Sequence, residues 1–561
     1  MMGIYVNQIG YLPKERKIAV STIAGSFQII SDSDQTCVWK GSAFEVGTDD
    51  SSGDEIWLID FSALKEDGNY HIVNDQGECS PSFEIGPQVY RGLKHDLMKA
   101  FYFQRCGCAL TEEYAGVYTH AACHTGKAIF LEDYVNQTPN PTSLDMNGGW
   151  HDAGDYGRYT TAGAVAVAHI LYAYELFPQS LQTTLQIPET GNEIPDVLNE
   201  CLYELKWLLK MQAPDGGVYH KLTSFSHADF IMPEDDHSQF LIYPVSSMAV
   251  ADFVAIMALA SRVYQHFAPY FSKKALLAAK KSWEWLNTHS YVGFHNPEGS
   301  NTGEYDDDCD LDERMWAAAE LLRSDDTNTE AYRTKLLEYS FVFFNSMAPV
   351  SDAKTFNSTT DFGWTNVSGF AMISVLFDEN HRAGEAIETV YRKILMKDAN
   401  TLLSIYKKSR YRLAMLPGDF CWGSNMVVCN RSMLFIICSL LKGEGSDGAF
   451  REAALEHLHY LLGKNALGIS YVTGHGEYAF CNPHNRPTFA DGIDLPMPGW
   501  VSGGPNKKPC DPAANSRIPQ GTPPMKCYVD DVDSYSTNEI TIYWNSPAVF
   551  MVAYFDSFAE E

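Results

Sequence analysis

Short apolar stretches separated by turn residues run through the first 88 residues, a pattern typical of β-strands. The alternation predicts strands at 17–21, 26–30, 55–59 and 68–73. The segment has the size of a small β-sandwich. We therefore predict a β-domain over residues 1–88.

From about residue 89 the apolar positions recur at the spacing of helices instead. The pattern predicts helices at 162–177, 195–212, 248–267, 273–289, 313–323, 331–347 and 451–462. Long loops rich in polar residues separate them, at 213–247, 291–312, 350–368 and 463–538. A run of helices with few strands predicts an all-α body over residues 89–561, and about a dozen helices would suit a helical toroid.

Composition narrows the classes of ligand. A formal net charge of −30 disfavours nucleic acids and anionic membranes but is compatible with a neutral polysaccharide. Aromatic residues make up 13% of the chain, with 11 Trp and 31 Tyr, and aromatic rings stack on the flat faces of sugars. A large aromatic core would give the same composition.

Thirteen cysteines form no regular framework, and an odd number leaves at least one unpaired. Cys201, Cys429 and Cys438 lie in apolar helical runs, so we expect buried thiols there. No signal peptide is visible and no apolar run is long enough to cross a membrane. We expect an extracellular protein whose leader has been removed, with a cytoplasmic location as the alternative.

Two acidic residues, Asp152 and Asp155, lie just before a strongly apolar helix, with only Ala153 and Gly154 between them. Carboxylates at this spacing can turn to the same side, which is costly unless they hold a cation, a proton or a water. A sugar hydrolase needs such a pair to grip and deprotonate water. A helix N-cap with a solvated neighbour, or a pair of calcium ligands, would explain the same residues.

A third acid, Glu539, opens an apolar helical stretch near the end of the chain and is flanked by Asn538 and aromatic residues. A partly desolvated pocket raises a carboxyl pKa, as a general acid requires. The alternative is an ordinary first-turn Glu that the helix dipole favours.

Two further segments carry metal-ligating residue types. Cys106, together with the adjacent pair Cys123 and His124, combines thiolates with an imidazole, a set of ligands that suits zinc. Free thiols or a Cys106–Cys123 disulfide are the alternatives. The densely acidic segment 302–313 offers hard oxygen ligands for calcium, or is a solvated acidic loop.

Three motifs in a fixed order identify a family. They are Gly148–Tyr156, which contains both aspartates, then Asn482–Arg486, then Asn538–Ile540. In this order they resemble glycoside hydrolase family 9, the cellulase family. The likeness extends to residues 5–12, 194–196, 232–234 and 316–320, nearly the whole chain. The chain also resembles clostridial endoglucanases of this family, which implies an immunoglobulin-like β-sandwich followed by an (α/α)6 barrel.

The resemblance implies roles for single residues. Asp155 would be the general base, Asp152 would hold the water, and Glu539 would protonate the leaving oxygen of a β-1,4-glucan. Hydrolysis would invert the anomeric carbon, with base and acid about 6.5–9.5 Å apart. The residues implied to bind or border the sugar are Trp422, His484, Arg486 and Trp544. Asn485 departs from the family's usual His, and we expect little effect.

The resemblance also implies structural metals, with no catalytic cofactor. A zinc ion would take Cys106, Cys123 and His124, with His151 as the first choice of fourth ligand and Cys108 or His120 as alternatives. Calcium would take the remaining implied ligands, Thr302, Gly303, Asp312, Glu313 and Asp361.

Four functions remain open. The sequence favours an endo-acting β-1,4-glucanase, a monomer that binds polysaccharide or cello-oligosaccharide. The alternatives are an exo-acting member of the family (a cellobiohydrolase or exo-glucosaminidase), a carbohydrate-binding protein without activity, and an acidic protein that binds partners through its sandwich. The short gap between Asp152 and Asp155 favours glucan over chitosan.

Overall fold

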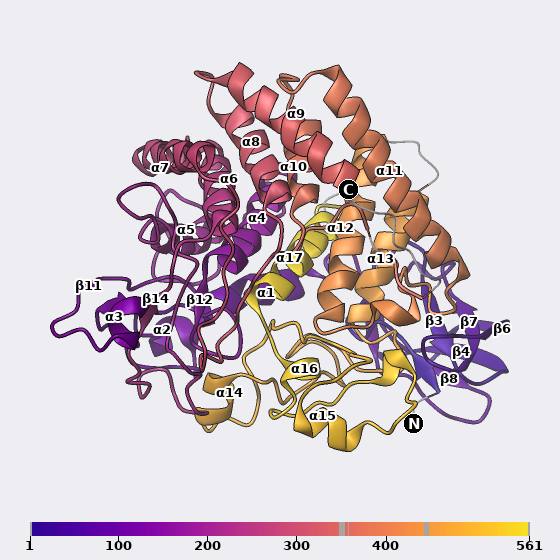
Figure 1. The fold of residues 1–561 in the computed structure, drawn as a ribbon. Helices are drawn as coiled ribbons and strands as arrows, with labels where there is room; N and C mark the ends of the chain where they lie inside the picture. The colour runs from indigo at the N-terminus through magenta and orange to yellow at the C-terminus, as the bar shows by residue number, and fades with distance from the viewer. Residues whose placement is uncertain (1–2, 347–353, 357, 443–447, 559–561) are drawn as a thin grey trace.

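The computed structural model describes residues 3–346, 354–356, 358–442 and 448–558. Strands occupy the first part of the chain and helices most of the rest, as the sequence predicts (Figure 1). The last of the N-terminal strands ends at Ile85, and the first helix begins at Arg91.

Nine short strands, counted from residue 3 onward, form the N-terminal β-sandwich. They are β1 Ile4–Tyr5, β2 Gly10–Tyr11, β3 Ile18–Ser21, β4 Ser26–Ser31, β5 Cys37–Ser42, β6 Phe44–Thr48, β7 Glu55–Asp60, β8 Gly68–Asn74 and β9 Phe83–Ile85. One sheet has the order β1-β3-β7-β6 and the other β2-β9-β8-β4-β5. Apolar side chains such as Phe27, Ile59 and Ile72 form a single buried core between the sheets.

The four predicted strands are confirmed as β3, β4, β7 and β8. Strands β5 and β6 escape prediction because their side chains are exposed or half-exposed on both faces. Without one buried face, no alternation of apolar and polar residues marks them in the sequence.

Twelve helices of nine or more residues, counted over the described ranges, build the second part. They are α1 Arg91–Phe103, α4 Thr160–Leu176, α5 Asp196–Leu208, α6 Ser247–Val263, α7 Pro269–Thr288, α8 Leu311–Ser324, α9 Thr329–Ser346, α10 Ser368–Leu376, α11 Glu385–Lys408, α12 Ser424–Lys442, α13 Ala449–Leu461 and α17 Ile542–Asp556. The seven predicted helices are among them, with ends that agree within four residues. Cys201, Cys429 and Cys438 are buried, as predicted.

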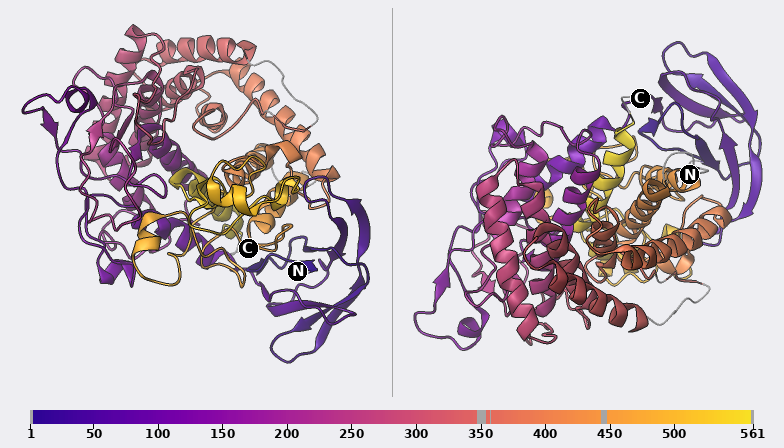
Figure 2. Two further views of the ribbon diagram at one scale, coloured as in Figure 1. Left: turned by 60° about the horizontal axis from the view of Figure 1, so that its bottom comes forward. Right: turned by 90° about the horizontal axis from the view of Figure 1, so that it is seen from above.

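The helices form two concentric layers (Figure 2). Inside, α4 packs on α6, α6 on α8 and α8 on α10, while α17 packs on both α12 and α4. Each inner helix pairs with an outer one: α4 with α5, α6 with α7, α8 with α9, α10 with α11, α12 with α13, and α17 with α1. This is the predicted (α/α)6 barrel.

Burial explains the composition of the inner helices. Every residue of α17 is buried, whereas the outer α11 buries only one face. A helix surrounded by others is apolar all round. Helix α12 is also strongly apolar, with a mean hydropathy of 1.5 over 18 residues. By length and composition it could cross a membrane, whereas we expected no such run from the sequence. Yet 72% of that window is buried inside the protein.

A small sheet at one end of the barrel is not predicted by the sequence, because it is assembled from two- and three-residue strands in separate loops. Its order is β11-β10-β14-β13-β12. The strands are β10 Ala128–Phe130, β11 Ser143–Leu144, β12 Arg158–Tyr159, β13 Lys221–Thr223 and β14 Leu241–Ile242. Strand β12 begins three residues after Asp155, so this sheet fixes the end of the segment that carries Asp152 and Asp155.

Candidate active site

A cavity of about 840 Å³ opens at the end of the barrel where the inner helices α4 and α8 begin. All seven residues predicted to act on or bind a sugar line it: Asp152, Asp155, Trp422, His484, Arg486, Glu539 and Trp544. Segments nearly 400 residues apart in the chain therefore meet in one place.

Backbone contacts fix the segment that carries the two aspartates. The Asp152 N–H donates to the Gly157 carbonyl at 2.9 Å, and the His151 N–H donates to the Gln104 carbonyl at 2.7 Å. At Gly154, a Cβ atom would lie 1.9 Å from the His484 carbonyl oxygen. Only glycine permits this approach, so the small residue between the acids is a packing requirement.

Asp155 is held as a carboxylate. Its Oδ2 accepts the Gly157 N–H at 2.9 Å and lies 3.3 Å from Nδ1 of His227. Burial alone would raise the pKa of Asp155. The contact with His227 and the charge of Arg486 outweigh burial and hold that pKa well below its usual value.

Asp152 has the opposite environment. The Tyr305 hydroxyl donates to its Oδ2 at 2.5 Å, whereas its buried Oδ1 has no hydrogen-bond partner. Burial, together with the negative charge of Asp155, raises the pKa of Asp152 well above its usual value. The two aspartates are therefore not equivalent, a distinction that their spacing alone does not reveal.

Glu539 lies between two helices, not in the first turn of one. It follows α16 (Tyr535–Asn538), and α17 begins three residues later with Thr541 as its N-cap. The prediction that Glu539 opens the helix is wrong, because its backbone pairs with that of His484. Burial, then repulsion by Asp155 and Asp152, raises the pKa of Glu539 well above its usual value.

The two predicted sugar-binding side chains are already partly engaged. His484 Nδ1 lies 2.5 Å from the Val532 carbonyl, and burial lowers the pKa of this imidazole. A neutral ring that donates through Nδ1 offers Nε2 as an acceptor for a sugar hydroxyl. Arg486 donates to the carbonyls of Ala228 and Gly154, both at 2.8 Å. The second bond also stabilises the segment that carries Asp152 and Asp155.

The two predicted aromatic residues differ in exposure. Trp422 is 47% exposed and lies 5.5 Å from Tyr535, centroid to centroid. Trp544 on α17 is only 4% exposed and packs beside the Gly423 and Gly503 backbone. Trp422 can therefore offer a ring face to a ligand, whereas Trp544 forms part of the cavity wall.

Asn485, the departure from the family pattern, has a local structural role. It is the N-cap of α14 (Arg486–Ala490), and its side chain accepts from the Thr488 N–H at 3.0 Å. Asn is among the best N-cap residues. The substitution thus leaves its two neighbours in the cavity.

The four predicted zinc ligands converge, and one of them, His151, directly precedes Asp152. The ligand atoms of Cys106, Cys123, His124 and His151 all lie within 4.8 Å of one another. His124 Nε2 also lies 3.2 Å from Asp236 Oδ2, a carboxylate of the kind that orients zinc-bound imidazoles. All thirteen cysteines are free thiols, so the structure has no Cys106–Cys123 disulfide.

Several of the five predicted calcium ligands have hydrogen-bond partners within the protein. Thr302 Oγ1 and the Gly303 carbonyl both accept from the ammonium of Lys221. Among the described residues, the carboxylates Asp312, Glu313 and Asp361 are in no group with metal-ligand spacing. Asp312 accepts the Val367 N–H and Asp361 accepts the Asn430 amide, while burial and neighbouring acids raise the pKa of Glu313. The Lys221 ammonium thus occupies one hydrogen-bonding position at Gly303, and the calcium site stays a prediction.

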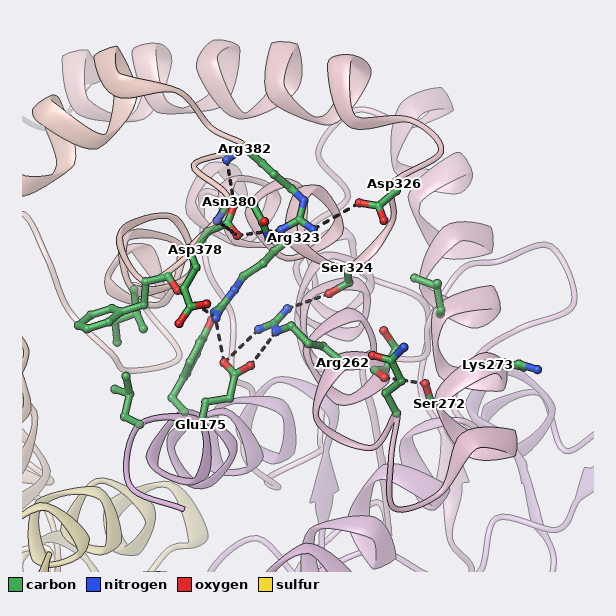
Figure 3. Close-up of a pocket in the computed structure, with 18 of the residues that line it drawn as sticks. Glu175, Arg262, Ser272, Lys273, Arg323, Ser324, Asp326, Asp378, Asn380 and Arg382 are labelled. Carbon is green, nitrogen blue, oxygen red and sulfur yellow. Dashed lines mark hydrogen bonds and ion pairs between the residues drawn. The ribbon is translucent and has the colours of Figure 1, made fainter. Parts of the chain in front are cut away.

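A second cavity, about 620 Å³, lies at the opposite end of the barrel, where α4, α6, α8 and α10 end (Figure 3). Several of its charges are paired: Arg262 and Arg323 contact Glu175, and Arg382 contacts Asp378 at 2.8 Å. Arginines in the last turns of α6 and α8 also complement the helix dipoles. These ion pairs give the arginines and their acidic partners a stabilising role without a ligand. We therefore place the active site in the first cavity.

Sequence reasoning missed three residues that contact the acids or their supports. His227 contacts Asp155, Tyr305 contacts Asp152, and Lys221 holds the segment before Tyr305. They lie in the segments 213–247 and 291–312, which the sequence marks as polar loops but not as near the aspartates; Lys221 is on the short strand β13. Only the pairing of β12 with β13 brings Lys221 and Tyr159 together.

Comparisons with known proteins agree with this architecture. Residues 90–552 match the model of glycosyl hydrolase family 9, and residues 2–78 match the cellulase N-terminal ig-like domain. The chain is 40% identical to a cellodextrinase of Butyrivibrio fibrisolvens, with 99% of each covered. It is 33% identical to endoglucanase D of Acetivibrio thermocellus, covering 98% of this chain and 83% of the relative.

A solved structure extends the likeness to three dimensions. The complex of AaCel9A with cellobiose-like isofagomine superposes with a TM-score of 0.89 at 34% identity, covering 99% of both chains. The N-terminal sandwich is thus immunoglobulin-like, as the sequence implies. The chain is a glycoside hydrolase and belongs to glycosyl hydrolase family 9.

Proposed function

We propose that this enzyme cleaves β-1,4-glucosidic bonds within glucan chains and inverts the anomeric carbon. One observation carries the proposal: a single cavity holds buried carboxyl groups whose environments push their pKa values apart. Asp155 is kept ionised and Glu539 is kept protonated. An inverting glycosidase needs one carboxylate and one carboxylic acid. The names of the relatives, an endoglucanase and a cellodextrinase, support a β-glucan substrate.

The reaction is a single displacement. Asp155 accepts a proton from water as the water oxygen bonds to the anomeric carbon. The bond from that carbon to the glycosidic oxygen breaks, and Glu539 donates its proton to the leaving oxygen. The partnerless Oδ1 of Asp152 is free to hydrogen-bond that water and so orients the attack.

Substrate binding follows from the walls of the cavity. The half-exposed Trp422 supplies a ring face for a glucosyl unit. His484 supplies an acceptor and Arg486 its remaining N–H groups for sugar hydroxyls. A neutral glucan also suits a protein with a net charge of −30, since such a ligand is not repelled.

Internal cleavage can be tested on soluble carboxymethyl cellulose. We expect viscosity to fall steeply while few reducing ends form, because each internal cut shortens a chain greatly. Release of reducing ends without loss of viscosity would contradict endo action and favour chain-end attack or hydrolysis of short cellodextrins. The Glu539→Gln variant serves as the inactive control.

We propose a structural zinc ion on Cys106, Cys123, His124 and His151. Thiolates and imidazoles at this spacing suit tetrahedral zinc, and His151 precedes Asp152, so the metal would brace the catalytic segment. Elemental analysis should give one zinc per chain, and a strong chelator should lower the melting temperature by several degrees. Metal-free protein with an unchanged melting temperature would contradict the site.

A further inference from the structure

A fully buried lysine lies beside the active-site cavity. Lys221, on β13, donates from its ammonium to Asn296 Oδ1 at 2.6 Å, Thr302 Oγ1 at 3.1 Å and the Gly303 carbonyl at 2.6 Å. An ammonium has three N–H donors, so all three are used. None of its hydrogen-bond partners among the described residues is a carboxylate, which is unusual for a buried charge.

Aromatic rings complete the surroundings of this ammonium. The nitrogen lies 4.5 Å from the ring centre of Tyr243, 5.3 Å from that of Phe294 and 5.7 Å from that of Tyr159. Ring faces at such distances attract a cation. Three oxygens and the faces of three rings therefore surround the ammonium.

The lysine holds a segment that leads to the active site. Its three acceptors lie within residues 296–303, and the neighbouring His220 contacts the Glu304 carbonyl at 2.8 Å. The next residue is Tyr305, whose hydroxyl donates to Asp152. Tyr305 has a φ of +53°, a left-handed conformation that a bulky residue adopts only when its surroundings impose it.

We propose that Lys221 is a positioning residue for hydrolysis: its ammonium is a built-in cation that fixes residues 296–304 and thereby keeps Tyr305 on Asp152. The inference rests on the proposed function, since it assumes that Asp152 orients the attacking water.

The test is Lys221→Met, which keeps the length of the side chain and removes the charge. We expect kcat on cellopentaose to fall roughly 10- to 100-fold, because a small misplacement of a catalytic group has effects of that size. KM should change less than about threefold, since Lys221 does not line the cavity. An unchanged kcat in the folded variant would overturn the proposal.

A double-mutant cycle separates positioning from general destabilisation. If Lys221 acts through Tyr305, the Lys221→Met/Tyr305→Phe enzyme should lose no more activity than the more impaired single variant. Losses that multiply would show that the two residues act independently. Should Lys221→Met fail to fold, Asn296→Ala removes one acceptor and should give a smaller loss in kcat, again without additivity to Tyr305→Phe.

Lys99 offers a matched control. It is a buried lysine on α1 that donates to the Leu185 and Gln186 carbonyls, so Lys99→Met should lower stability without lowering kcat. Asp155→Asn separates the two claims. If that variant stays active, the proposed function fails; if it is inactive while Lys221→Met keeps its kcat, only the role of Lys221 fails.

Discussion

Replacing Glu539 by Gln is expected to lower kcat on soluble β-glucan roughly 10²- to 10⁴-fold, the usual contribution of a general acid. The glutamine keeps the shape of the side chain but has no proton to give to the leaving oxygen. KM should change little, since the cavity walls remain. The variant should melt at or above the wild-type temperature, because a buried acid with a raised pKa is replaced by a neutral amide.

Two controls make this result specific. A substrate with a good leaving group, such as 2,4-dinitrophenyl β-cellobioside, should restore much of the rate, because its leaving oxygen needs no proton. In the wild-type enzyme, activity should fall as pH rises through the raised pKa of Glu539, since the acid form is then lost. A Glu539→Gln enzyme with undiminished hydrolysis of β-glucan would remove Glu539 from the mechanism.

Replacing Asp155 by Asn should cause a loss of similar size, but one that responds to different rescue. Without a base, water is no longer deprotonated as it attacks. A good leaving group should not restore the rate. Azide, which attacks without losing a proton, should restore it and give a glycosyl azide of α configuration.

Asp152→Asn is the matched comparison, because Asp152 lies in the same segment and lines the same cavity as Asp155. An asparagine there keeps an oxygen that can accept from water, so the loss should be smaller than for Asp155→Asn. If azide rescued the Asp152 variant and not the Asp155 variant, the assignment of base and helper would be reversed.

Strong local patterns in the sequence predict most of the strands and helices of this protein and three of its four candidate zinc ligands. Alternation marks the strands with one buried face, and apolar periodicity marks the helices. Cys106, Cys123 and His124 lie close in sequence, so their chemistry is visible before folding. The domain boundary at residue 88, the extracellular location and the monomeric state stay predictions.

Other features depend on contacts that no local pattern encodes. The difference between Asp155 and Asp152 comes from His227 and Tyr305, which lie on separate loops. Burial of Glu539 raises its pKa only once the barrel closes around it. The contact of Lys221 with Thr302 and Gly303 is also non-local, because the lysine lies on a strand about 80 residues earlier.

The most direct test of the proposed mechanism is the configuration of the first product. Proton NMR during early hydrolysis of cellopentaose resolves the two anomers of the new reducing end before they equilibrate. A single displacement by water activated at Asp155 predicts that the α-anomer appears first. Initial accumulation of the β-anomer would contradict inversion and require a covalent intermediate instead.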